Sequence, residues 1–166
     1  NRLSQLVRMN LRQEYAQIFK TYRGQLHDLD PTELLILANA AKTLGRHGVL
    51  KAAIDRLREQ LGDVPDVMQL YLHYIRMQND RAAAVSITAT VTRAQLGDPT
   101  HALVAFCDFL VARHAWAALA RIVALYEAEP EGELPAPLYG ARVLVRLRRR
   151  DYARAIVAAR IGVSRA

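Results

Sequence analysis

Apolar residues recur three or four positions apart along almost the whole chain, and the alternation typical of strands is hard to find over more than a few residues. In residues 3–26 this spacing places an apolar stripe on one face of a helix. The stripe consists of Leu3, Val7, Leu11, Tyr15, Ile18, Tyr22 and Leu26. Ala and Leu dominate and only 7% of the residues are aromatic, which also favours helix. The sequence therefore predicts an all-α protein.

Prolines recur at nearly even intervals, 34, 34 and 36 residues apart, at places that suit the first turn of a helix. They are Pro31, Pro65, Pro99 and Pro135. Residues 30–33 (DPTE) have the form of a helix start with a capping box, and residues 98–100 (DPT) copy its first three letters. Residues 58–63 (REQLGD) are echoed by residues 93–98 (RAQLGD). These features indicate an internal repeat of 34–36 residues.

A short polar or basic break divides each period into two helices. The breaks lie at 45–48, 78–80, 113–114 and 148–151. The predicted helices are 32–45 and 48–61, 66–78 and 80–96, 100–113 and 115–128, and 137–148 and 151–163. Because one such pair cannot bury its apolar face alone, we expect a right-handed α-solenoid of about four helix-turn-helix repeats. The alternative is an irregular helical bundle in which the proline spacing is coincidental.

The predicted repeats follow an N-terminal helix within residues 1–29, which caps the stack or forms half of a further repeat. Their boundaries are 30–64, 65–98, 99–134 and 135–166. The chain begins with Asn1, so we expect a processed or partial chain.

Two segments resemble known helical repeats. Residues 150–156 (RDYARAI) are similar to the turn and second-helix start of a tetratricopeptide repeat. Residues 29–45 (LDPTELLILANAAKTLG) resemble the heptatricopeptide-type repeats of organellar RNA-processing proteins. Together with the related pentatricopeptide class, the resemblance covers residues 30–163. The tryptophan and glycine of a standard tetratricopeptide first helix are missing, and the base-selecting positions of pentatricopeptide repeats have no counterpart, so no nucleotide code carries over.

What this resemblance implies is a non-enzymatic binding scaffold in an organellar ribonucleoprotein complex, such as a mitochondrial ribosome. A mitochondrial matrix location is implied in the same way. From the composition alone we expect a reducing compartment, because one cysteine among 166 residues excludes an internal disulfide framework.

Positive charge is concentrated at the end of the chain. Residues 138–166 hold eight arginines and one acidic residue, so they carry the equivalent of the whole net charge of +7. Arg142, Arg146 and Arg149 recur at helical spacing and share one face of the predicted helix, beside Arg148 and Arg150. Arginine pairs with phosphate in two places, so this face predicts contact with an RNA backbone. An acidic protein surface and a merely solvated face are the alternatives.

Tyr139 is the stacking candidate beside these arginines, whereas Trp116 is interpreted as a packing anchor between repeats. A second hypothesis is a protein–protein adaptor that holds a peptide or helix in a groove formed by first helices, through Asn39, Tyr74 and Asp108. A third is a structural subunit of a large mitochondrial assembly without RNA contact. Residues 127–133 (EAEPEGE) are interpreted as an exposed acidic linker.

Motifs for catalysis are missing from the sequence. There is no glycine-rich phosphate loop and no cysteine or histidine spacing typical of zinc, so no catalytic, cofactor-binding or metal-binding residue is predicted. Cys107 lies on an apolar stripe and is interpreted as a small core residue. No apolar run approaches the roughly 20 residues of a membrane span, so we expect no membrane insertion.

Overall fold

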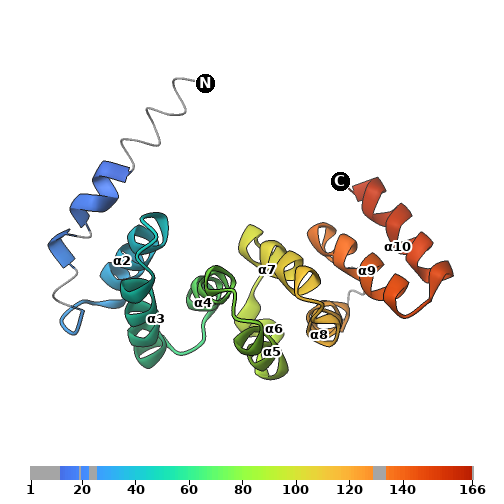
Figure 1. The fold of residues 1–166 in the computed structure, drawn as a ribbon, viewed down its shortest axis with the longest axis horizontal. Coiled ribbons are helices and arrows are strands. Elements are labelled where there is room, and N and C mark those ends of the chain that lie inside the picture. Colours follow the sequence, from blue (N-terminus) through green and yellow to red (C-terminus); the bar gives the residue numbers. More distant parts are fainter. Residues whose placement is uncertain (1–11, 19, 23–25, 129–133, 166) are drawn as a thin grey trace, which may run out of the picture. The chain divides into compact units, whose positions relative to one another are not determined.

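The computed structural model describes residues 12–18, 20–22, 26–128 and 134–165, and the secondary structure of this part of the chain is entirely helical (Figure 1). The chain divides into two compact units, Asn1–Tyr74 and Ile75–Ala166. The all-α class predicted from the apolar spacing is confirmed for the described residues. The stacking of helix pairs into a right-handed solenoid stays a prediction.

The first unit is built around one helix pair. Residues 12–18 and 20–22 are helical, which fits the helix predicted in 3–26, whereas residues 1–11 lie outside the described part. The helices that follow are α2 (Pro31–Thr43), α3 (His47–Leu61) and the greater part of α4 (Pro65–Gln78). Buried side chains of these helices form one core together with Leu29, which precedes α2. The helical members are Leu34, Leu37, Ala38, Ala41, Leu50, Ala53, Ile54, Leu57, Val67 and Leu70.

The predicted start of α2 is confirmed in detail. The Asp30 carboxylate accepts a hydrogen bond of 2.9 Å from the Glu33 backbone N–H, and the Glu33 carboxylate accepts one of 3.1 Å from the Asp30 N–H. This reciprocal capping box satisfies two backbone donors that a helix start otherwise leaves unpaired.

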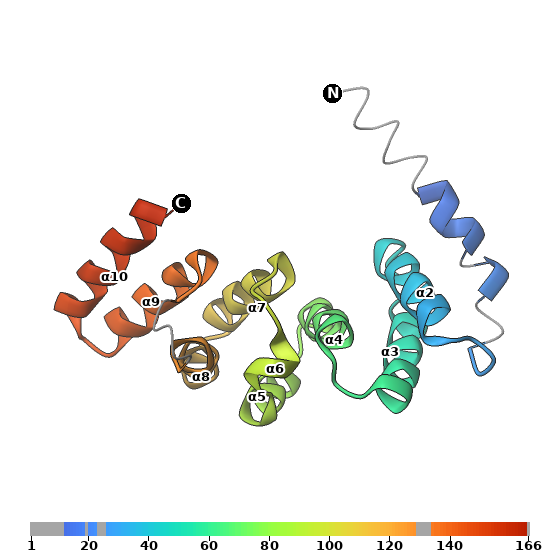
Figure 2. The ribbon, with the colours of Figure 1, turned by 180° about the vertical axis from the view of Figure 1, so that it is seen from behind.

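The second unit contains the last turn of α4 and the remaining helices. They are α5 (Arg81–Thr90), α6 (Arg93–Leu96), α7 (His101–Ala112), α8 (Trp116–Glu127), a 3-10 turn η1 (Ala136–Leu138), α9 (Tyr139–Arg148) and α10 (Tyr152–Arg165). Phe106, Leu110, Leu119, Ile122 and Tyr126 are fully buried on α7 and α8. Helix α8 lies beside α9, and α9 beside α10, in both views of the ribbon (Figures 1 and 2).

The same tight turn occurs at all four predicted breaks. In each turn one residue adopts a left-handed conformation, namely Gly45 (φ 67°), Asn79 (φ 58°), His114 (φ 54°) and Arg150 (φ 59°). The next residue donates its backbone N–H to the carbonyl five positions earlier, in the pairs Arg46–Ala41, Asp80–Ile75, Ala115–Leu110 and Asp151–Arg146. This is the Schellman pattern at a helix end. The regular spacing of helix-turn-helix elements is therefore present in the backbone as well as in the sequence.

One predicted helix, 80–96, is wrong. Helix α5 ends at Thr90, Val91 is extended (φ −62°, ψ 144°), and the short helix α6 begins after Thr92. The Thr92 side chain accepts a hydrogen bond from the Gln95 backbone N–H, and the Gln95 side chain accepts one from the Thr92 N–H. A threonine that caps a new helix competes with continuation of the old one, and the β-branched residues around it weaken the helix further.

The left-handed turn before α3 gives a matched pair of substitutions. We expect Gly45→Ala to lower the free energy of unfolding by about 1 kcal/mol, because a Cβ at φ 67° is strained even though no other atom lies within 4 Å of it. We expect Gly48→Ala, inside α3 and equally open, to leave that free energy unchanged or raise it by a few tenths of a kcal/mol. Urea unfolding followed by circular dichroism measures both, and equal effects would contradict the turn geometry.

Candidate functional site

Two of the predicted ligand-binding arginines are engaged inside the second unit. Arg142 Nε lies 2.7 Å from Glu127 Oε1, and Arg146 lies 3.8 Å from the same oxygen and 3.6 Å from Asp151 Oδ2. The side chains of Glu127, Arg142 and Arg146 are 29%, 24% and 20% exposed. This cluster ties α8 to α9 and to the turn before α10. Of the three arginines predicted to share one helix face, Arg142 and Arg146 are therefore paired with carboxylates, and Arg149 lies exposed at the turn.

The interpretation of residues 127–133 as a linker needs correction at its first residue. Glu127 is the last residue of α8 and half-buried against the two arginines, rather than solvated. Residues 129–133 lie outside the described part of the chain.

The other three predicted arginines are exposed at the turn between α9 and α10. Arg148 is the last residue of α9, and Arg149 and Arg150 form the turn, with Arg150 in the left-handed position. The guanidinium carbon of Arg148 lies 6.0 Å from the centroid of the Trp116 ring. These arginines keep the outward placement that a phosphate-binding role requires.

Tyr139 does not have the exposure that base stacking requires. The residue is 4% exposed, and a Cβ built on Gly162 would lie 2.9 Å from Tyr139 Cβ. Tyr139 therefore packs at the close approach of α9 and α10, where a glycine leaves room for it. The stacking role that the sequence predicts for Tyr139 does not fit this placement, because 4% exposure leaves little of the ring for a base to stack on.

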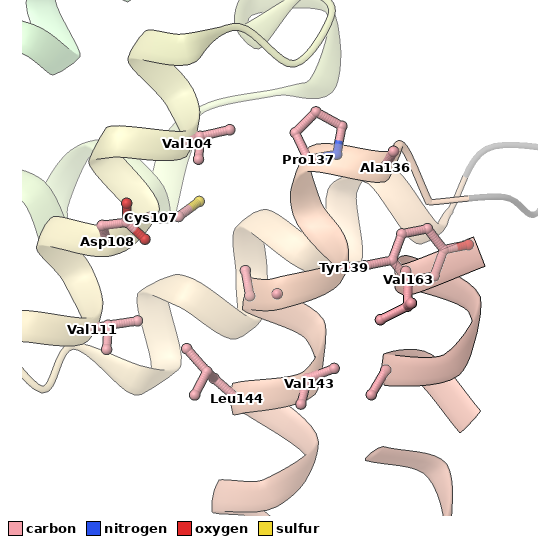
Figure 3. Close-up of a pocket in the computed structure, with 14 residues that line it drawn as sticks. Val104, Cys107, Asp108, Val111, Ala136, Pro137, Tyr139, Val143, Leu144 and Val163 are labelled. Atoms are coloured by element: carbon pink, nitrogen blue, oxygen red, sulfur yellow. The ribbon is translucent and has the colours of Figure 1, made fainter. Parts of the chain in front are cut away.

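An apolar groove of about 650 Å³ lies between α7, η1, α9 and α10 (Figure 3). Its lining consists of Val104, Cys107, Asp108, Val111, Ala136, Pro137, Tyr139, Gly140, Ala141, Val143, Leu144, Ala159, Gly162 and Val163. In the close-up, Leu144 of α9 points toward α7, whereas Val143 and Tyr139 point toward α10. Leu144 and Val163 are 38% and 81% exposed, so apolar surface is open to a ligand.

Asp108 is the one charged side chain among the described residues that line the groove. It belonged to the predicted adaptor surface together with Asn39 and Tyr74, which lie in the first unit. Asn39 is exposed on α2 and donates a hydrogen bond of 2.9 Å to the Leu35 carbonyl, and Tyr74 packs partly buried against the core of that unit. Of the three residues, Asp108 alone lines this groove.

Cys107 lies beside Asp108 and is 3% exposed. Burial and, to a smaller extent, the negative charge of the Asp108 carboxylate together raise the pKa of the Cys107 thiol to about 12. The side chain is therefore a neutral thiol at physiological pH and contributes apolar surface to the groove, as its place on the apolar stripe predicts.

Trp116 is the residue that the sequence interpretation assigned to packing and that the structure leaves half-buried, with part of its surface accessible. It lines a small hollow of about 150 Å³ with Ala117, Ala120, Val145, Arg148 and Arg149. The signal in the sequence was its position two residues after the third break, one repeat period before the arginine-rich fourth break.

Within the described ranges, no group of three or more His, Cys, Asp or Glu side chains is placed to hold a metal ion. No helix in this part of the chain has the length and apolarity needed to cross a membrane. Comparisons with protein-family models, curated proteins and solved structures returned no match.

Proposed function

We propose that the chain is a non-enzymatic helical-repeat scaffold and that its groove between α7 and α9 holds a segment of a partner protein. The groove carries this proposal, because its volume of about 650 Å³ and its apolar lining are typical of a binding site and it accepts aliphatic side chains. Exposed apolar surface of this kind is normally covered when a protein is at work.

The occupant that fits best is an amphipathic helical segment with aliphatic side chains and one lysine or arginine. The aliphatic side chains match the valine and leucine lining, in the way that amphipathic helices bind grooves elsewhere. The basic residue pairs with Asp108, whose carboxylate is exposed at the groove. A bound segment without a basic residue would remove water from this carboxylate and offer no partner in its place.

The experiment is a selection of displayed random peptides of about 16 residues on the purified chain, a length that spans such a groove. We expect the selected peptides to combine aliphatic residues at helical spacing with a basic residue. Selection on the Asp108→Lys variant should replace that basic residue by an acidic one, because the charge at the groove is reversed.

Binding of a selected peptide should be lost in Leu144→Arg, which places a charge in the groove. The control is Val85→Arg on α5, a position of similar exposure (41% against 38%) that does not line the groove. Equal binding to both variants, or no change of charge preference with Asp108→Lys, would show that the groove is not the binding site.

Contact with an RNA backbone is the second candidate function, favoured by the exposure of Arg148, Arg149 and Arg150. Phosphate contacts of this kind give affinity without sequence choice. Membership of an organellar ribonucleoprotein and location in the mitochondrial matrix are proposals that rest on the resemblance to organellar helical repeats.

A further inference from the structure

The hollow beside Trp116 combines an aromatic side chain with two cationic ones. Trp116 is the first residue of α8, and Arg148 and Arg149 are the end of α9 and the first residue of the following turn. Ala117 and Ala120 on α8 are small, so the hollow stays open next to the indole. A volume of about 150 Å³ equals that of roughly five molecules of liquid water, which suits one flat group.

The charges around this hollow are predominantly positive. Arg113 and Arg150 are exposed at the neighbouring turns, and Arg81 donates a hydrogen bond of 3.0 Å to the Arg113 carbonyl. Asp151, the acidic residue of the last turn, already faces Arg146 and Arg154 at 3.6 Å each. The His114 ring lies 6.1 Å from the Trp116 ring and adds a second aromatic surface.

The contact between Arg148 and Trp116 leaves room for a ligand. At 6.0 Å from the ring centroid, the guanidinium lies at the outer limit of a cation–π interaction, so a planar group displaces little when it binds against the indole. Bases stack on tryptophan irrespective of sequence, and arginine pairs with the adjoining phosphate.

We propose that Trp116, Arg148 and Arg149 form a site for one nucleotide of single-stranded RNA, with its base against Trp116 and its phosphate paired with the arginines. This inference rests on the second candidate function, contact with an RNA backbone, and adds base stacking to it. A run of acidic side chains alone satisfies the arginines but does not stack on the aromatic ring, whereas RNA supplies a phosphate and a base and so accounts for all three residues.

Because Trp116 is the one tryptophan in the sequence, its fluorescence reports on this hollow directly. The experiment titrates the full chain with a labelled oligouridylate of about 12 nucleotides, longer than one stacking site needs, and records both label anisotropy and tryptophan emission. We expect anisotropy to rise and tryptophan emission to fall with the same midpoint. Polyglutamate is the comparison polyanion and should leave the emission unchanged.

Variants separate the site from general positive charge. Trp116→Leu should weaken oligouridylate binding by about tenfold, as expected for loss of one stacked base. Arg149→Ala should weaken it by about fivefold, whereas Arg160→Ala, an exposed arginine of α10 that does not line the hollow, should change it by less than about twofold. Circular dichroism of each variant checks that the helices are intact.

The possible results distinguish the nucleotide site from general contact with the RNA backbone. If oligouridylate binds without quenching Trp116, and Arg149→Ala behaves like Arg160→Ala, the nucleotide site is wrong and backbone contact stands. If oligouridylate fails to bind near physiological salt, both are wrong. If polyglutamate binds and competes with oligouridylate at equal strength, the turn is an acidic-partner surface and the nucleotide site is again wrong.

Discussion

Replacing Tyr126 with alanine is expected to lower the free energy of unfolding of the second unit by about 3–5 kcal/mol, the usual range for truncating a fully buried aromatic side chain. The Tyr126 ring has no exposed surface, and its hydroxyl donates a hydrogen bond of 2.8 Å to the Gly97 carbonyl. The Arg93 guanidinium carbon lies 4.1 Å from the ring centroid. Alanine therefore leaves a cavity and also removes the contact that holds the end of α6 against α8.

A graded series separates the ring from its hydroxyl. We expect Tyr126→Phe to cost about 1 kcal/mol, because Arg93 also donates to the Gly97 carbonyl and keeps that acceptor satisfied. Leu125→Ala, at the half-buried neighbouring position, is the control and should cost about 1–2 kcal/mol. Urea unfolding followed by circular dichroism measures all three. A cost for Tyr126→Ala no larger than that for Leu125→Ala would contradict the packing of α8.

The end of α6 also shows how much of this packing the sequence could predict. The similar segments 58–63 and 93–98 form the same local structure. Each has a glycine of positive φ (74° and 64°), and in each the arginine pairs with the aspartate that comes directly after this glycine. The hydrogen bond that Arg58 donates to the Asp63 carboxylate raises the pKa of Arg58 above its ordinary value, so the guanidinium stays charged. The repeated sequence motif was therefore sufficient to predict this local structure.

The aromatic partners of these two arginines could not be predicted from the sequence. Arg58 lies over Tyr71 at 4.8 Å, and Arg93 over Tyr126 at 4.1 Å. Tyr71 follows Arg58 by 13 residues, whereas Tyr126 follows Arg93 by 33. Because repetition of a sequence motif fixes local hydrogen bonds but not which later helix packs against them, only the structure identifies these partners.

The same limit applies to the candidate binding residues. The periodic breaks predicted all four turns, because left-handed helix ends depend on a few neighbouring residues. The break between α5 and α6 was also accessible, since Thr92 and Gln95 form a capping box in the sequence itself. The ion pair between Arg142 and Glu127 could not be predicted, because the two residues are 15 positions apart on different helices. A count of charges does not distinguish a paired arginine from an exposed one.

The ion pair between Glu127 and Arg142 gives the second prediction with a large expected effect, a loss of stability. We expect Glu127→Ala to lower the free energy of unfolding of the second unit by about 2 kcal/mol, between the values for exposed and buried ion pairs. The carboxylate is 29% exposed and faces Arg142 at 2.7 Å and Arg146 at 3.8 Å. Without it, Arg142 loses this ion pair, and Arg146, one turn further along α9, keeps the one with Asp151. Urea unfolding of the variant measures the loss.

The arginines of this helix should then divide into two groups. Arg142→Ala should cost about 1–2 kcal/mol of stability, and its effect should largely disappear in the Glu127→Ala background, because the two changes remove the same ion pair. Arg149→Ala, at an exposed position, should change stability by less than about 0.5 kcal/mol. Equal stability losses for Arg142→Ala and Arg149→Ala would contradict a stabilising ion pair between Arg142 and Glu127. The expected difference assigns Arg142 to holding α8 against α9 and would show that Arg149 is not needed for that contact.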